Sequence, residues 1–227
     1  MKKSGRKIVG VVAWDYPMAQ IADRAGVDIV SVGDSVGVNL WGQGPDEVTL
    51  DEMLIVCKAV RRGVRRALVS VDLPAHEQNV AAALRLKECG AEMVKLTGSA
   101  DLVRAVVRAG VPVFAEFHGG KDDAALLVDH ARRLEDAGAS LLDFRHSGPV
   151  AGAAVARAVR IPVIGGLGGG PWLDGRLRMA HAAIGYGASN LDSNAEQYAN
   201  VAKIALEAIS TYAQDVRAAR QIKGQRA

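Results

Sequence analysis

Short apolar runs alternate with amphipathic segments along most of the chain. Several of the runs end in a polar residue next to glycine or proline, and they span residues 7–15, 27–34, 67–74, 91–98, 111–119, 140–148 and 161–165. Runs that are apolar throughout are typical of parallel strands covered on both faces. Gly90, Gly110 and Gly138 each end a predicted helix and precede a strand, which indicates right-handed strand–helix–strand crossovers. The pattern predicts an α/β protein, with a single (β/α)8 TIM-type barrel domain over residues 1–227.

The eighth strand of this barrel is the least clear in the sequence. We place it at 188–191, between a predicted helix around 176–186 and a last helix at about 195–220. The C-terminal tail from about residue 221 is expected to be flexible. The barrel is therefore predicted to close with a short last strand.

Composition narrows the possible functions. The chain has 227 residues, of which 49% are hydrophobic, and its net charge is only +3 with basic residues scattered, so we expect no nucleic-acid partner. No apolar run reaches membrane-spanning length, so we expect no membrane partner, and the run after the basic N-terminus is too short for a signal peptide. Cys57 and Cys89 have no metal-site spacing. We therefore expect a cytoplasmic protein that acts on a small molecule.

Two aspartates end neighbouring predicted strands and give the first indication of chemistry. Asp34 follows the run 27–34, and Asp72 lies near the end of 67–74. Because parallel strands point their carboxyl ends to one side of a barrel, both carboxylates should face one opening. Two carboxylates, with water and substrate completing the shell, commonly hold Mg²⁺. The alternative is that one of them caps the helix that follows.

Charged residues at other predicted strand ends add candidates for substrate binding. Lys95 lies between apolar neighbours, and we expect it near these carboxylates or an anionic substrate, unless it extends to solvent from the outer layer. On the run 140–148, Asp143 and Arg145 share one face. Arg145 could bind a substrate carboxylate bidentately or form an ion pair with Asp143 or Glu116. The sequence alone leaves both possibilities open.

Candidate acid–base groups lie on the same two strands. Glu116 and His118 share a face of the run 111–119, and His146 is on the other face of its strand from Asp143. Carboxylates and imidazoles are the usual groups for proton transfer. A lone histidine is also often a hydrogen-bonded structural residue, so the pattern does not by itself select one base.

Several of these stretches together resemble the ketopantoate hydroxymethyltransferase family, within the phosphoenolpyruvate mutase and isocitrate lyase superfamily. One is Val-Gly-Asp-Ser-Val-Gly at 32–37, and the others lie at 13–16, 48–53, 59–63, 71–74, 90–96 and 161–165, with Asp-Gly at 174–175. They follow the family's order over nearly the whole chain. The resemblance implies a (β/α)8 barrel that forms large homo-oligomers and uses Mg²⁺. It implies transfer of a one-carbon unit from 5,10-methylenetetrahydrofolate to the enolate of a branched 2-oxo acid.

Some of the family's functional residues carry over directly. The resemblance implies that Asp34 and Asp72 are metal ligands, that Ser35 contacts the substrate, and that Lys95 lies beside the substrate oxygens. On this resemblance, these four residues would bind the metal and the substrate carboxylate as they do in the family. The common part of the site is therefore expected to be present.

Three positions depart from the family's pattern. Thr97 stands where the family has a glutamate, Glu116 where it has a histidine, and Arg145 where it has the glutamate that takes the substrate proton. Arginine stays protonated and cannot be that base. We therefore expect Glu116 as a possible third metal ligand and Arg145 as a site for a second anionic group. Proton transfer would fall to Asp143, Glu116 or His146, with Arg145 also in the catalytic set.

Three functions are compatible with these observations. The leading hypothesis is an Mg²⁺-dependent transferase of the ketopantoate hydroxymethyltransferase type that forms a C–C bond next to the carbonyl of an altered 2-oxo acid. The second is a C–C or P–C lyase or mutase of the superfamily, which needs no folate. The third is a non-catalytic barrel subunit, suggested by the loss of the family's base.

Overall fold

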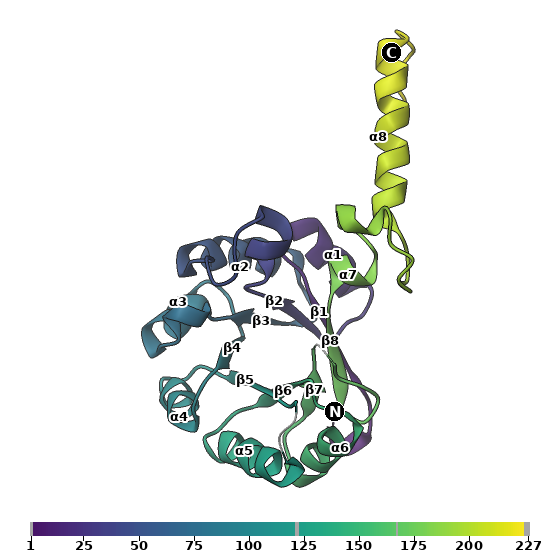
Figure 1. Ribbon diagram of the computed structural model, residues 1–227. Helices are drawn as coiled ribbons and strands as arrows, with labels where there is room; N and C mark the ends of the chain where they lie inside the picture. Colours follow the sequence, from purple (N-terminus) through teal and green to yellow (C-terminus); the bar gives the residue numbers. More distant parts are fainter. Residues whose placement is uncertain (1, 121–122, 167, 225–227) are drawn as a thin grey trace. The chain divides into compact units, whose positions relative to one another are not determined.

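The protein folds as a closed barrel of eight parallel strands. The structure is a computed structural model that describes residues 2–120, 123–166 and 168–224. The strands follow one another around the barrel in sequence order (Figure 1). They are β1 Ile8–Val12, β2 Ile29–Val32, β3 Leu68–Asp72, β4 Met93–Thr97, β5 Val113–His118, β6 Leu141–Arg145, β7 Val163–Gly165 and β8 Gly175–Met179. The predicted (β/α)8 barrel is confirmed.

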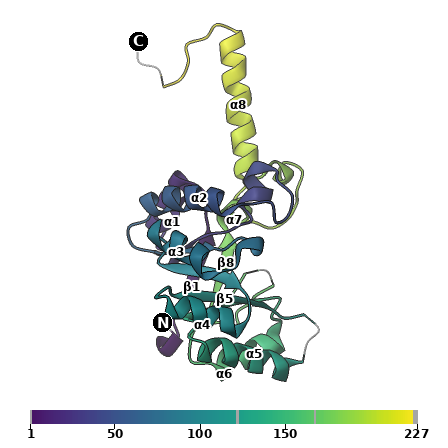
Figure 2. The same cartoon turned by 90° about the vertical axis from the view of Figure 1, so that its left-hand side faces the viewer.

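Within the described part of residues 2–178, six α-helices surround this barrel (Figures 1 and 2). They are α1 Tyr16–Arg24, α2 Leu50–Gly63, α3 Val80–Glu88, α4 Ala100–Arg108, α5 Ala124–Asp136 and α6 Pro149–Ala158. A capping box starts α2: the Thr49 hydroxyl accepts from the Glu52 backbone N–H, and the Glu52 carboxylate accepts from the Thr49 backbone N–H. Gly37–Trp41 forms a π-helical turn after β2, and Ala75–Glu77 forms a 3-10 turn after β3.

Strand alternation separates an outer apolar layer from a polar interior. Phe117 of β5 and Phe144 of β6 stack with ring centroids 4.4 Å apart, and the ring of His130 on α5 lies 5.4 Å from Phe117. Both phenylalanines therefore face the helical layer. Because successive side chains on a strand point to opposite faces, Glu116 and Asp143, which are paired in the ladder, face the barrel interior.

The prediction for the eighth strand was wrong. β8 lies at Gly175–Met179, where it overlaps the helix predicted around 176–186, and it pairs with β7, whereas Ala188–Asn190 forms a 3-10 turn. Exposed Arg176 and Arg178 alternate with buried Leu177, and this charged, short strand carries no continuous apolar run. Glycine is needed at its start, because a Cβ on Gly175 would lie 2.1 Å from a backbone oxygen of β1.

The chain divides into two compact units, Met1–Arg178 and Met179–Ala227. The second unit contains the short helix α7 Ala180–Ala183 and the longer α8 Val201–Arg217, which starts later than predicted. Residues 225–227 of the predicted flexible tail lie outside the described residues. None of the described helices is both long and apolar enough to cross a membrane.

Truncation of Phe144 tests the packing that orients β5 and β6. Phe144 is fully buried, so Phe144→Ala should lower the free energy of unfolding by about 3–5 kcal/mol, through lost burial and the cavity that remains. Phe144→Leu should cost clearly less. Denaturant unfolding followed by circular dichroism measures both changes, and equal stabilities of the wild type and Phe144→Ala would contradict this packing.

Candidate active site

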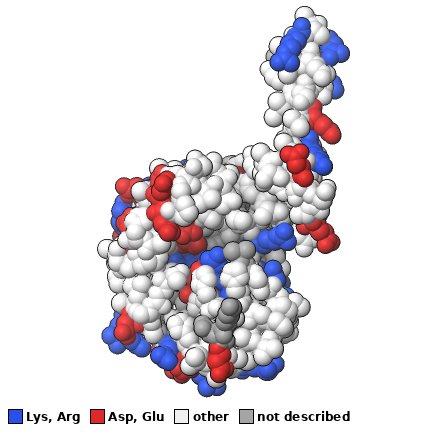
Figure 3. Space-filling model, viewed as in Figure 1, with Lys and Arg blue, Asp and Glu red and all other residues white. Residues whose placement is uncertain are grey.

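Charged side chains from four consecutive strands converge at the carboxyl end of the barrel. Figure 3 shows acidic and basic side chains gathered in the hollow at the barrel's centre. A cleft of about 260 Å³ lies there, lined by Asp34, Asp72, Leu73, Ala75, Gln78, Lys95, Leu96, Thr97, Glu116 and Arg145. The predicted strand-end residues Asp34, Asp72, Lys95, Glu116 and Arg145 are thus brought to one site.

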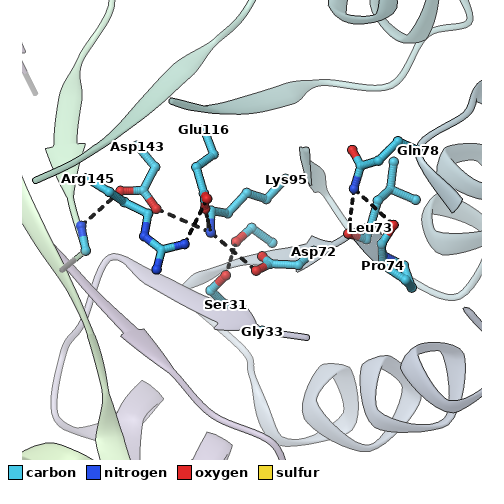
Figure 4. A network of polar contacts seen from close by, with 12 residues as sticks. Ser31, Gly33, Asp72, Leu73, Pro74, Gln78, Lys95, Glu116, Asp143 and Arg145 are labelled. Atoms are coloured by element: carbon cyan, nitrogen blue, oxygen red, sulfur yellow. Dashed lines mark hydrogen bonds and ion pairs between the residues drawn. The ribbon is translucent and has the colours of Figure 1, made fainter. Parts of the chain in front are cut away.

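The Lys95 ammonium lies at the centre of this site. Its Nζ atom is 2.5 Å from Glu116 Oε2 and 3.3 Å from both Asp72 Oδ2 and Asp143 Oδ2 (Figure 4). The Lys95 side chain is only 9% exposed. Burial alone would lower the pKa of Lys95, but the three carboxylates raise it above its ordinary value, so the amine stays charged. The lysine therefore faces the barrel interior, which excludes the alternative of a solvent-directed chain.

Glu116 connects Lys95 to a second cation. Its Oε1 atom accepts from Arg145 Nη1 at 2.9 Å and lies 3.1 Å from His118 Nε2. Burial would raise the pKa of Glu116, but Lys95 and Arg145 outweigh it and lower the pKa to about 2. Of the alternatives open for Arg145, the structure forms the ion pair with Glu116.

This pairing bears on the prediction of Glu116 as a third metal ligand. Both Glu116 oxygens are engaged by Lys95, Arg145 and His118. Within the described residues no three His, Cys, Asp or Glu side chains are grouped so that they could hold a metal ion. In place of a three-carboxylate ligand set, the structure therefore forms an ion-pair network around Glu116.

Asp34 and Asp72 remain as candidates to hold a divalent cation. Burial raises the pKa of Asp34, and burial together with the charges of Asp34 and Glu116 raises the pKa of Asp72 to about 7. Asp72 Oδ1 is buried and has no hydrogen-bond partner. A divalent cation would neutralise the repulsion between these two carboxylates and would provide a partner for the free oxygen of Asp72. The pair therefore fits a site in which two protein ligands, water and substrate hold Mg²⁺.

The other predicted site residues lie at different depths. Asp143 is 1% exposed and also accepts from the Gly166 backbone N–H at 2.9 Å, so it supports Lys95 from beneath the cleft. Ser35 does not line the main cleft but, with Asp34, lines a neighbouring hollow of about 190 Å³. His146 is exposed and has a φ of 51°. Among the described aromatic rings, its ring is near that of His118 alone.

Sequence reasoning missed one residue of the cleft. Gln78 donates from Nε2 to the carbonyl oxygens of Leu73 and Pro74, at 2.7 and 3.1 Å, while its buried Oε1 has no partner. The amide oxygen could therefore accept a hydrogen bond from a ligand. Gln78 lies in the loop after β3, where no periodic pattern marks a residue as facing the barrel opening.

Comparisons with known proteins bear on the family of the chain. The family model described as ketopantoate hydroxymethyltransferase matches residues 1–221. The chain belongs to the ketopantoate hydroxymethyltransferase family. The 3-methyl-2-oxobutanoate hydroxymethyltransferase of Geobacillus kaustophilus (strain HTA426) is 36% identical over 244 residues, which cover 96% of this chain and 87% of that protein. The protein of the same name from Pyrococcus furiosus is 34% identical, over 95% and 84% of the two chains. This chain is accordingly an enzyme of the transferase class.

Solved structures place the ketopantoate hydroxymethyltransferase barrel among related folds. The structure of 2,3-dimethylmalate lyase, a phosphoenolpyruvate mutase and isocitrate lyase superfamily member, has a TM-score of 0.65 and 14% identity, over 99% of this chain and 87% of that one. Phosphonopyruvate hydrolase in complex with oxalate and Mg²⁺ has a TM-score of 0.66 and 13% identity, over 96% and 85%. At these identities the likeness establishes the fold.

Removal of the Lys95 charge tests the ion-pair network. Lys95→Met leaves three buried carboxylates without their shared cation, so the free energy of unfolding at neutral pH should fall by about 3–5 kcal/mol in the presence of EDTA. Lys95→Met combined with Asp143→Asn should recover part of the loss, because one buried charge is also removed. Denaturant unfolding measures both, and wild-type stability of the single variant would contradict the network.

Proposed function

We propose that this enzyme, with Mg²⁺ bound, transfers a one-carbon unit from 5,10-methylenetetrahydrofolate to the carbon next to the carbonyl of a 2-oxo acid. The observation that carries the proposal is the pair of carboxylates, Asp34 and Asp72, on a cleft that also holds two cations. Membership of the ketopantoate hydroxymethyltransferase family supports hydroxymethyl transfer as the reaction. The changed residues Glu116 and Arg145 support a substrate other than the family's usual acid.

In this proposal, different residues of the cleft bind the metal and the substrate. Asp34 and Asp72 would hold Mg²⁺, which when bound supplies the positive charge that stabilises the enolate. Lys95 keeps Glu116 ionised, opposes the rise in the pKa of Asp72, and holds both carboxylates in place through its ion pairs. Arg145 neutralises a carboxylate of the substrate. Ser35, beside Asp34, contacts the substrate from the neighbouring hollow.

Glu116 is our choice for the proton acceptor. Of Asp143, Glu116 and His146, only Glu116 lines the cleft. Its low pKa makes it a weak base, so enolate formation relies more on charge stabilisation than on base strength. His118, whose side chain is 48% exposed, lies against Glu116 and would pass the proton to solvent. The deprotonated carbon then forms the C–C bond to the one-carbon unit, the two C–N bonds that hold this unit to the folate break, and tetrahydrofolate leaves. Water supplies the hydroxyl oxygen. The proton from the substrate carbon and the two from water end on that hydroxyl and on the two released nitrogens.

The setting of the reaction follows from the same proposal. We propose a cytoplasmic homo-oligomer whose partners are small molecules, a 2-oxo acid and the folate donor. The expected cofactor is Mg²⁺, and folate acts as a co-substrate. Neither a nucleic acid nor a membrane takes part.

Substitution of the two aspartates tests the metal site. Asp34→Asn and Asp72→Asn should each weaken Mg²⁺ binding by about 100-fold or more, because a neutral amide replaces a charged ligand. Asp101→Asn, at an exposed residue of α4, is the matched control and should bind Mg²⁺ as the wild type does. Calorimetric titration with Mg²⁺ measures the affinities, and unchanged binding by both site variants would contradict this assignment.

The reaction itself is tested by product analysis. The enzyme is incubated with 5,10-methylenetetrahydrofolate, Mg²⁺ and a panel of 2-oxo acids that includes ketoisovalerate, and the hydroxymethylated acid is detected by mass spectrometry. The proposal predicts a product that requires both folate and metal. Cleavage of an oxo acid without folate would instead identify a lyase, and the absence of any product with every acid would identify a non-catalytic barrel.

A further inference from the structure

The two cations of the cleft differ in what they can offer a ligand. Lys95 has three ammonium N–H donors, and three carboxylates already surround its Nζ atom, from Asp72, Glu116 and Asp143. Its side chain is 9% exposed. The donors of Lys95 are therefore used by protein carboxylates, and an anionic group of the substrate needs another cation to pair with.

Arg145 has donors to spare. Its Nη1 atom donates to Glu116 Oε1 at 2.9 Å, and no described residue accepts a hydrogen bond from its Nε or Nη2. The side chain is 30% exposed and lines the cleft. The ion pair with Glu116 fixes the orientation of the guanidinium, and the edge formed by Nε and Nη2 stays available to a ligand. This planar edge matches the two oxygens of a carboxylate.

Arg145 is also separated from the carboxylates that would hold the metal. In Figure 4 the Arg145 guanidinium and the Asp72 carboxylate lie on opposite sides of the Lys95 ammonium. Glu116 stands between the two cations and contacts both. A ligand whose oxo-acid end is bound at Asp34 and Asp72 would therefore reach Arg145 with its far end.

We propose that Arg145 binds a second carboxylate, so that the substrate is a 2-oxo dicarboxylic acid. The inference rests on the proposed function, which places the oxo-acid end of the substrate at the metal site. It adds that the opposite end of the substrate carries a carboxylate. An alkyl group in this place would cover the free Nε and Nη2 donors without a partner, and the desolvation of unpaired charged donors is costly. A carboxylate there satisfies both donors at once.

Binding measurements on matched acids test this inference without requiring turnover. The probes are 2-oxoglutarate and 5-methyl-2-oxohexanoate, in which a neutral isopropyl group of similar shape replaces the far carboxylate. Calorimetric titration with Mg²⁺ present should show the dicarboxylate binding wild type at least about tenfold more tightly, as expected for a charge-assisted bidentate pair. In Arg145→Met this ratio should fall to about one, and Arg145→Lys should give an intermediate ratio.

The ratio of the two affinities separates a specific effect from general damage to the site. Arg104→Met, at a partly exposed arginine of α4 outside the cleft, is the control and should keep the wild-type ratio. Three results would each overturn the inference. The wild type could bind both acids with equal affinity, or bind no dicarboxylate at all. Alternatively, Arg145→Met could lower the affinity for both acids and leave the ratio of their affinities unchanged. The last result would show that Arg145 binds the carboxylate common to all 2-oxo acids.

The outcome is independent of the transfer reaction. If discrimination depends on Arg145 but no hydroxymethylated product forms with either acid, the proposed function fails while the substrate class stands. If product forms from monocarboxylic acids only and the affinities do not differ, the proposed function stands and the inference fails.

Discussion

The site depends on one buried ammonium shared by three carboxylates. Lys95 reaches into the barrel from β4 and contacts acids on β3, β5 and β6, so it ties together four consecutive strands at their carboxyl ends. Without this cation, the burial of three negative charges would be too costly for the fold. The lysine also sets the electrostatics of the cleft, because it lowers the pKa of Glu116 and opposes the rise in that of Asp72. The remaining features of the site can be understood as consequences of how this charge is shared.

Glu116 and Arg145 extend the network toward solvent and change what the cleft can recognise. Relative to the residues that the family resemblance implies, a base on β6 is replaced by a permanently charged guanidinium, and a carboxylate on β5 holds it in place. In our proposal, the cleft thereby gains an edge of guanidinium donors for an anion, in place of the proton acceptor that the resemblance implies. Glu116 and Arg145 line the same cleft as Asp34 and Asp72, the two carboxylates proposed to hold the metal.

Much of this could be predicted from the sequence, and the failures have physical causes. Seven strands were marked by continuous apolar runs, and the aspartates at two strand ends followed from the geometry of parallel barrels. β8 was missed because Arg176 and Arg178 face outward and interrupt the apolar pattern. The sequence could not decide which carboxylate pairs with Arg145, because Asp143 on the same strand and Glu116 on the preceding strand could both lie close to it. Only the side-chain geometry, which commits Asp143 to Lys95 and Gly166, resolves it.

The central claim is that this charge arrangement forms an enolate from a 2-oxo acid. Exchange of the proton on the carbon next to the carbonyl, followed by NMR in D₂O, tests it most directly because it requires neither the donor nor product release. The account predicts exchange with at least one 2-oxo acid that occurs with Mg²⁺, is suppressed by EDTA, and is abolished in Glu116→Gln. Exchange that is equally fast with EDTA, or no exchange with any acid, would contradict it.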